Sequence, residues 1–443
     1  MEKARVAGLF FACTPEPIYM ASIERQTCER MDARFDCYDH AGKFPQRANT
    51  VVPILSPGPI RPKIISKLPA VGTTIFTTMS TLAQQVDAVN LGQGFPDFDC
   101  DPRLIDYMAE AMRMGFNQYP PMAGLPALRE AVGDKVAALY GRQYDATSEI
   151  TITAGATQAI QTALTALVHP GDEVIIFEPV YDSYEPVIRL NGGVPVYARL
   201  QYPTYRPDWG EVRALVTPRT RAIMINTPHN PTATTWAAAD MHALAQLLRN
   251  TGIILISDEV YEHMVFDKAM HQSVASYPAL AERAFVISSF GKTYHVTGWK
   301  VAYCLAPSEL MAEFRKTHQF VVFTVHTPSQ HAIARYMTLA THLQLSGFYQ
   351  TKRDFFLDAV KNTRLRWLPS AGTYFASASY AHLPEYAAMG DADFAFFLAR
   401  QHRVACIPLS AFYHDGADHQ VVRFCFAKKE STLTLAAGRL QEI

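Results

Sequence analysis

The stretch Ala284-Phe-Val-Ile-Ser-Ser-Phe-Gly-Lys292 has the pattern of a buried strand followed at once by a loop that carries a lysine. The apolar and β-branched run Ala284–Ser288 predicts the strand. A lysine at a strand end, among small and aromatic neighbours, is partly desolvated, and desolvation favours the neutral amine that attacks a carbonyl. Most lysines in such loops are solvated surface charges, so this stretch alone does not establish a site.

The same pattern recurs on both sides of this stretch, where short β-branched runs alternate with amphipathic segments. The other expected strands are Ile150–Thr153, Glu173–Phe177, Val194–Arg199, Ala222–Asn226, Ile253–Ser257 and Val301–Leu305. The expected helices are Thr157–Val168, Ser183–Asn191, Ala237–Asn250 and Ser308–Gln319. This alternation predicts an α/β fold with a mainly parallel seven-stranded sheet, in which ligands bind beyond the carboxyl ends of the strands.

The segment Ser257-Asp258-Glu259-Val260-Tyr261 follows one of these strands. A buried carboxylate facing a pyridine nitrogen would keep that nitrogen protonated and make the ring an electron sink, and a phenol three residues later could reach a ring oxygen. The alternative is a helix cap by Asp258 with Tyr261 packed in the core. Both interpretations fit this segment when it is taken alone.

Two further motifs follow strands. In Asn226–Thr232, Pro228 and Pro231 fix a rigid loop in which Asn230 can hold a hydrogen bond to a ligand. In Thr153–Gln158, small residues lead into a helix whose first N–H groups can bind an anion. A plain turn explains either motif singly, but an anion site, a ring-oxygen partner, a carboxylate and an amine all at strand ends favour a ligand site.

Composition narrows the function further. The chain has 443 residues, 49% of them apolar, and it balances 40 basic against 41 acidic residues, which disfavours nonspecific binding to nucleic acid or anionic membranes. No apolar run approaches the length of a membrane helix. The seven cysteines form no metal-ligand spacing and are expected as free thiols in a reducing cytoplasm.

Four regions are expected along the chain. Residues 1–62 show no sustained period and end in a proline-rich stretch, so we expect an irregular extension. Residues 111–327 hold the alternating pattern and are expected to form a large ligand-binding domain. Residues 63–110 and 328–443 are expected to form a smaller α+β domain together, because the short first segment has too little apolar surface for a core of its own.

Seven motifs occur in order between Lys63 and the carboxy terminus, and they include several of the segments described above. They are Asn90-Leu-Gly-Gln-Gly-Phe-Pro-Asp97, Asn117-Gln-Tyr119, Glu178-Pro-Val-Tyr181, Pro228-His-Asn-Pro231, Ser257-Asp-Glu-Val-Tyr261, Ser289-Phe-Gly-Lys292 and Val422-Arg-Phe424. With these motifs the sequence resembles the class I aminotransferases of pyridoxal-phosphate fold type I, and within them the methionine and kynurenine aminotransferase group. The family often has glycine where this chain has Ala233, which leaves the detail of that loop open.

The resemblance implies a cofactor, pyridoxal 5′-phosphate, and a role for each matching residue. Lys292 would hold the cofactor and shuttle a proton, Asp258 would pair with its ring nitrogen, and Tyr181 would stack on its ring. Asn230 and Tyr261 would contact the phenolate oxygen. The phosphate ligands would be Ala156, Thr157, Ser289, Lys300 and, from a second subunit, Tyr119.

The resemblance also implies how the substrate binds. Arg423 would clamp its α-carboxylate with help from Gly94 and Asn230. Phe76 and Tyr184 align with regions that line the side-chain pocket, as do Phe320, Phe323 and His326, although core packing explains each of them singly. Their largely apolar character favours methionine, kynurenine or phenylalanine as amino donor.

Two other functions compete with the transaminase. A carbon–sulfur β-lyase on the same fold begins with the same Cα carbanion, and the motifs do not separate it from a transaminase. A non-catalytic regulator domain is disfavoured, because every catalytic position is retained and residues 1–62 carry no basic pattern. We therefore expect a cytoplasmic homodimeric transaminase that binds neither nucleic acid nor membrane.

Overall fold

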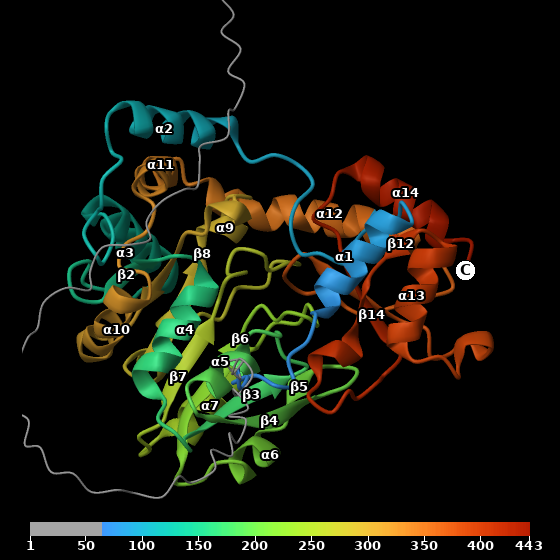
Figure 1. Ribbon diagram of the computed structural model, residues 1–443, viewed down its shortest axis with the longest axis horizontal. Coiled ribbons are helices and arrows are strands. Elements are labelled where there is room, and N and C mark those ends of the chain that lie inside the picture. Colours follow the sequence, from blue (N-terminus) through green and yellow to red (C-terminus); the bar gives the residue numbers. More distant parts are fainter. Residues whose placement is uncertain (1–63) are drawn as a thin grey trace, which may run out of the picture. The chain divides into compact units, whose positions relative to one another are not determined.

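The computed structural model describes residues 64–443, and Ile65–Ile443 form one compact unit (Figure 1). The expectation of an irregular extension over residues 1–62 lies outside the described residues.

The centre of this unit is an eight-stranded sheet with the order β2-β9-β8-β7-β6-β3-β4-β5. Its strands are β2 (Ile150–Thr153), β3 (Glu173–Glu178), β4 (Val194–Gln201), β5 (Arg206–Pro207), β6 (Thr220–Asn226), β7 (Ile254–Asp258), β8 (Ala284–Ser289) and β9 (Ala302–Leu305). Adjacent strands from β8 to β4 pair in parallel, while β9 and β5 run antiparallel to their neighbours. The α/β class and all seven expected strands are confirmed. The sheet has eight strands and not the expected seven, because β5 is an edge strand of two residues, too short to leave a period in the sequence.

Alternate residues of the central strands enter two separate apolar cores. In β3, Ile175 and Phe177 belong to the larger core, and Val174 and Ile176 belong to the other. Because successive side chains of a strand point to opposite faces, both faces of the sheet are covered. This explains why these strands are continuous apolar runs in the sequence.

Helices supply the covering layers. Those in the middle of the chain are α3 (Pro126–Tyr140), α4 (Ala156–Leu167), α5 (Tyr184–Leu190), α6 (Trp209–Ala214), α7 (Ala238–Leu248), α8 (Pro278–Ala281), α9 (Phe290–Thr293) and α10 (Ser308–Val321). The short 3₁₀ turns are η1 (Val274–Ser276), η2 (Thr297–Trp299), η3 (Thr341–Gln344), η4 (Pro384–Tyr386) and η5 (Leu409–Phe412). Ile160 of α4, Ile188 of α5 and Phe314 of α10 share one core, whereas Val132 of α3 and Leu244 of α7 lie in the other.

The two ends of the described chain meet in two smaller sheets. One has the order β10-β11-β14-β13, and the other pairs β1 with β12 in parallel. Their strands are β1 (Val89–Asn90), β10 (Arg366–Trp367), β11 (Phe375–Ser379), β12 (Val404–Ala405), β13 (Ile407–Pro408) and β14 (Val421–Cys425). Figure 1 shows α1 (Ile75–Gln85), α13 (Asp391–Gln401) and α14 (Glu430–Leu440) gathered around them.

The predicted division into a large and a small domain stays a prediction. The boundary between residues 110 and 111 falls within α2 (Pro102–Arg113), and the boundary between 327 and 328 falls after the first residue of α11 (Thr327–Met337). These two helices pack against each other. The long helix α12 (Leu345–Val360) follows α11 and packs against α14.

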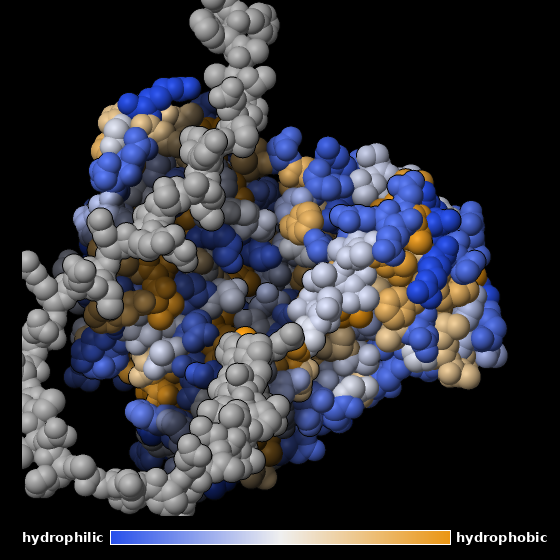
Figure 2. Space-filling view, viewed as in Figure 1, coloured by the Kyte–Doolittle hydropathy of each residue, from blue (hydrophilic) through white to orange (hydrophobic). Residues whose placement is uncertain are grey.

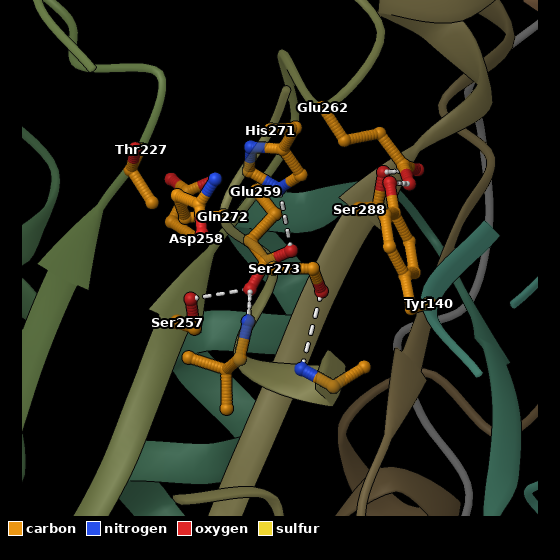
Figure 3. A network of polar contacts seen from close by, with 12 residues as sticks. Tyr140, Thr227, Ser257, Asp258, Glu259, Glu262, His271, Gln272, Ser273 and Ser288 are labelled. Atoms are coloured by element: carbon orange, nitrogen blue, oxygen red, sulfur yellow. Dashed lines mark hydrogen bonds and ion pairs between the residues drawn. The ribbon is translucent and has the colours of Figure 1, made fainter. Parts of the chain in front are cut away.

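A buried polar cluster ties the turn after β7 to its surroundings. Glu262 lies 2.6 Å from Lys135 Nζ of α3, and both side chains are less than a tenth exposed, at 3% and 6%. Tyr140, Ser288 and Tyr303 donate hydrogen bonds to the same carboxylate, and Figure 3 shows the contacts of Tyr140 and Ser288. Burial alone would raise the pKa of Glu262, but Lys135 and the hydrogen bonds outweigh it and hold the pKa well below the usual value.

Glu259, three positions before Glu262, has different partners. It accepts hydrogen bonds from Ser257 and from the backbone of Val274, and it contacts His271 (Figure 3). The two glutamates thus attach the segment after Asp258 to β7, β8 and β9.

On the face in Figure 2, hydrophilic residues predominate and apolar residues occur as scattered small patches. Among residues 64–443, no helix is both long and apolar enough to cross a bilayer.

We expect Lys135→Met to lower the free energy of unfolding by about 3–5 kcal/mol, because it leaves the Glu262 carboxylate buried without its cation. Urea unfolding of the full chain measures the change. The matched control is Lys361→Met, which removes an exposed ion pair with Asp358 and should cost less than about 0.5 kcal/mol. Equal effects of the two substitutions would contradict a stabilising role for the buried pair.

Candidate active site

Most of the expected site residues converge on one cavity at the carboxyl edge of the large sheet. Its volume is about 340 Å³. The register of the sheet explains the convergence, because Asn226 at the end of β6 pairs with Asp258 at the end of β7, and β8 ends beside them at Ser289. The lining includes Phe76, Gly94, Ala156, Thr157, Tyr181, Asn230, Asp258, Tyr261, Ser289, Lys292, Lys300 and Arg423 from the expected set.

One end of the cavity is built to hold an anion. Ala156 and Thr157 are the first residues of α4, and no side chain caps that helix, so its first N–H groups are free. Gly155 has a φ of +84°, and a Cβ there would lie 2.9 Å from Lys300 Nζ. The missing side chain of Gly155 lets Lys300 reach the helix start. A cation beside the positive end of a helix dipole favours a bound anion between them.

Asp258 lines the cavity and is buried. Its Oδ1 accepts a hydrogen bond from the backbone of Val260, and its Oδ2 accepts one from the hydroxyl of Tyr184 at 2.5 Å. Burial raises the pKa of Asp258 to about 6, against the effect of these hydrogen bonds.

For Tyr184 the structure differs from the sequence expectation. We expected it in the pocket for the substrate side chain, yet it is buried and does not line the cavity. Tyr184 starts α5 and turns its ring inward, because that helix buries the same face as Val187 and Ile188. Its hydroxyl supports Asp258 instead.

Arg423 on β14 lines the cavity. It is only 1% exposed, so its positive charge is buried. Its Nη1 donates to Asn230 Oδ1 at 2.6 Å and its Nη2 to the carbonyl of Gly92 at 3.0 Å. Its Nε has no hydrogen-bond partner, and none of the ion pairs among the described residues involves Arg423. A buried guanidinium without a carboxylate is costly, so this arrangement favours a bound carboxylate ligand.

The loop that carries Asn230 is fixed on both sides. The backbone N–H of Asn230 donates to Asn226 Oδ1 at 2.8 Å, so the end of β6 holds it. Ala233, where the family often has glycine, adopts a φ of 61°. The chain therefore keeps the left-handed turn there despite the Cβ.

Lys292 lies in the single turn of α9 with its amine inside the cavity. The amine donates to the hydroxyl of Tyr374 at 2.7 Å and to the carbonyl of Gly94 at 3.2 Å. Burial lowers the pKa of Lys292 to about 8, and the positive charges of Arg423 and Lys300 act in the same direction. Gly94, expected beside Arg423, lines the same cavity but directs its carbonyl to Lys292, while Gly92 serves Arg423.

Aromatic residues close the remaining walls. Tyr261 is buried with its ring 5.2 Å from that of Tyr374 in an edge-to-face arrangement. The guanidinium of Arg423 lies 3.9 Å from the ring centre of Phe375 and 5.5 Å from that of Phe76. The space beside the cationic groups is thus lined by apolar surface.

Tyr119 lies outside this cavity. It is 81% exposed and borders a second hollow formed by residues 117–120 and 324–328. Its ring contacts that of Phe323 edge to face, and Phe320 nearby in the chain is also exposed. Phe320, Phe323 and His326, candidates for the side-chain pocket, do not line the first cavity.

Sequence reasoning missed several lining or supporting groups, among them Gln93, Phe95, Asp182, Tyr374 and Phe375. Gln93 and Phe95 lie within the motif Asn90–Asp97, and Asp182 follows Tyr181, so these motifs are the signal that could have found them. For Tyr374 the only signal in the sequence is Gly372, which lies two residues earlier in a segment with the pattern of a strand.

Known proteins resemble this chain over most of its length. The model of the family "Aminotransferase class I and II" matches residues 86–440. Over 380 residues the chain is 51% identical to a methionine aminotransferase of Escherichia coli (strain K12), covering 85% of this chain and 98% of that protein. It is 38% identical to a probable N-succinyldiaminopimelate aminotransferase of Mycobacterium tuberculosis (85% and 97% covered). It is 34% identical to a kynurenine–oxoglutarate transaminase of Dictyostelium discoideum (84% and 94% covered).

A solved structure extends the likeness to three dimensions. The crystal structure of an Escherichia coli protein with a methionine aminotransferase function superimposes with a TM-score of 0.84 at 51% identity. The match covers 87% of this chain and 100% of that one.

We expect the amine of Lys292 in cofactor-free protein to become reactive above a pH of about 8, because burial lowers its pKa from the 10.5 of an ordinary lysine. Below that pH the amine is protonated and has no lone pair to attack with. Acetylation of the full chain at a series of pH values, followed by mass spectrometry of the Lys292 peptide, measures the midpoint. The exposed Lys268 serves as internal reference for the reagent, and a midpoint near 10.5 for Lys292 would contradict the expectation.

Proposed function

Because this chain belongs to the class I and II aminotransferases, we propose that it moves the amino group of methionine, or of another amino acid with an apolar or aromatic side chain, to a 2-oxo acid. It is a transaminase that depends on pyridoxal 5′-phosphate. The observation that carries the substrate proposal is the combination of one unpaired buried arginine with apolar cavity walls. The identity to a methionine aminotransferase supports the choice of methionine.

The residues of the cavity suit this cofactor. Its phosphate would be held by the free N–H groups of Ala156 and Thr157, the hydroxyl of Ser289 and the amine of Lys300. Asp258 would pair with the ring nitrogen, whose positive charge would restore the ionised form of a carboxyl whose pKa burial raises. Tyr181 would stack on the ring. When bound, the cofactor withdraws electrons from the substrate Cα and stores the amino group between the two half-reactions.

The amide of Asn230 is placed for two contacts. Its Oδ1 already accepts from Arg423, so its Nδ2 remains free to donate to the phenolate oxygen of the cofactor. Tyr261, a buried phenol of the same cavity, would donate to that oxygen as well. Asn230 thus connects the group that binds the substrate to the group that binds the cofactor.

Arg423 would bind the α-carboxylate of the amino acid. Its planar group is held by Asn230 and Gly92 and stacks near Phe375, so its orientation is set before the substrate arrives. Nη1 and Nη2 each keep one free N–H, and the N–H of Nε is also free, so the guanidinium can still donate to a carboxylate. This contact fixes the substrate Cα relative to Lys292.

Lys292 would move the proton. Its Nζ is neutral above a pH of about 8, and in that form it accepts the proton from the substrate Cα. Asp258 and Tyr261 complete the catalytic set that we assign.

The charges of the cavity argue against an acidic amino donor. Its cationic lining residues among those described are Lys292, Lys300 and Arg423. With Lys300 assigned to the phosphate, Lys292 to the proton and Arg423 to the α-carboxylate, none remains for a carboxylate on the side chain. Phe76 and Phe375 offer apolar surface at the same place.

We also propose a homodimer with shared active sites. The exposed ring of Tyr119, together with exposed Phe320 and Phe323, forms an apolar patch that a second subunit would cover. The hydroxyl of Tyr119 would then reach the phosphate in the neighbouring subunit. For the compartment we infer the cytoplasm, which suits the free thiols Cys100, Cys304, Cys406 and Cys425.

With purified enzyme and a 2-oxo acid acceptor, methionine should yield its oxo acid and a new amino acid in equal amounts. Its kcat/KM should exceed that of aspartate at least about tenfold, because a side-chain carboxylate would lack a cation, and tenfold corresponds to about 1.4 kcal/mol. Chromatography of both products over a panel with kynurenine, phenylalanine, aspartate and N-succinyldiaminopimelate measures the order. An acidic donor ranking first would contradict the proposal, and acceptor-independent pyruvate from a cysteine conjugate without oxo acid from methionine would favour the β-lyase.

A mixed dimer tests the shared site. Tyr119→Phe and Lys292→Ala subunits, purified together by two affinity tags, should show about half of the wild-type activity, because one of the two sites then has both side chains intact. The control is the mixed dimer of Lys292→Ala with wild type, which should give the same value. If Tyr119 served its own subunit, the mixed dimer would instead show half of the activity of the Tyr119→Phe enzyme.

A further inference from the structure

Tyr374 is a fully buried residue on the turn that precedes β11, and it contacts the proposed active-site lysine. The turn is rigid. Its Gly372 packs so closely that a Cβ would lie 2.8 Å from Pro228 and 2.9 Å from the carbonyl of Met264. Thr373 has a φ of 66°, and its backbone N–H donates to Met264 at 2.9 Å. The phenol of Tyr374 is therefore held in one place.

The hydrogen bonds of this phenol have defined directions. Its hydroxyl contacts the carbonyl of Gly94, and a carbonyl only accepts, so the single proton of Tyr374 is used there. The oxygen of Tyr374 is then left to accept from Lys292 Nζ, which lies 2.7 Å away. The same amine donates to Gly94 at 3.2 Å. Gly94 can come this close because it has no Cβ, which would lie 2.7 Å from Phe375.

A neutral amine has two N–H bonds and one lone pair. With both N–H bonds directed at Tyr374 and Gly94, the lone pair faces the remaining direction, which is the cavity. The amine can take up a proton only through this lone pair. The orientation of the amine is therefore set by two acceptors, Tyr374 and Gly94, on the side away from the substrate.

We propose that Tyr374 is a positioning residue for Lys292, which holds the free amine with its lone pair toward the substrate Cα. This rests on the proposed transaminase function. The four-carbon stem of lysine is flexible, and a base that is misplaced by about 1 Å loses about a hundredfold in rate. Burial raises the pKa of Tyr374 well above its usual value, so the phenol stays neutral and does not act as a second base.

Other charged and titratable groups also face the amine. They are Asp258, Tyr261, Lys300, Arg423 and Cys425. Asp258 and Cys425 raise the pKa of Lys292, whereas Arg423 and Lys300 lower it. Among the described residues Lys292 donates to Tyr374 and Gly94 and to none of these five groups, so Tyr374→Phe removes a contact that they do not replace.

The substitution Tyr374→Phe tests the proposal with two readouts. In cofactor-free full-length protein, loss of an acceptor that stabilises the ammonium form should move the acetylation midpoint of Lys292 about half a unit to one unit lower. In the loaded enzyme, kcat for methionine should fall about tenfold to a hundredfold, with KM nearly unchanged because Arg423 is untouched. Should Tyr374→Phe fail to fold, Tyr374→Met removes the hydroxyl in another way.

Tyr349→Phe is the matched control. Tyr349 is also fully buried, its ring centre lies 5.8 Å from that of Tyr374, and its hydroxyl has no hydrogen-bond partner. Its loss should leave both readouts at the wild-type values.

An unchanged acetylation midpoint in Tyr374→Phe would overturn the proposal even if kcat fell, since the effect would then be structural. A shifted midpoint with an unchanged kcat would overturn it too, because the contact would not guide the proton. Acetylation needs neither cofactor nor substrate. If wild-type enzyme fails to transaminate methionine while the midpoint shifts, the substrate proposal fails and the contact between Tyr374 and Lys292 stands.

Discussion

The parallel register of β6, β7 and β8 is the constraint on which the site depends. The register pairs Asn226 with Asp258, and β8 ends at Ser289. Chemically different side chains therefore reach one edge of the sheet, and their positions do not depend on the conformation of long loops. The buried cluster around Glu262 then fixes the segment after Asp258 from behind. A rigid scaffold of this kind holds catalytic groups better than loops alone.

The cost of this arrangement is electrostatic. Arg423 lies in the interior without a carboxylate, and Lys292 is neutral above a pH of about 8 because burial disfavours its charge. A bound carboxylate would offset the cost of the buried Arg423 charge, and the lowered pKa makes the neutral, basic form of Lys292 easier to reach. Part of the free energy of folding is thus lost to burying the Arg423 charge, and binding of a carboxylate ligand would recover it.

Much of this could be predicted from the sequence, because strands buried on both faces leave apolar runs and the motifs follow directly after them. The positions of Asp258, Asn230 and Lys292 in the cavity could be foreseen on that basis. The orientation of Tyr184 could not, since it depends on which face α5 buries, and local spacing does not specify this. Tyr374 was missed because its role requires the turn at Gly372 to meet Gly94, and the two are far apart in the chain.

Charge balance within the cavity links the fold to the class of substrate. The lining holds three cationic side chains, Lys292, Lys300 and Arg423, and two carboxylates, Asp182 and Asp258. The cofactor brings a phosphate and a ring cation, and the substrate brings an α-carboxylate, so each charge of the ligands meets an opposite one. Asp182 has no ion-pair partner among the described residues, and burial raises its pKa, while Arg423 lowers it. A side chain with a further carboxylate would face Asp182 without a compensating cation, whereas a thioether or an aromatic ring adds no charge and finds apolar walls.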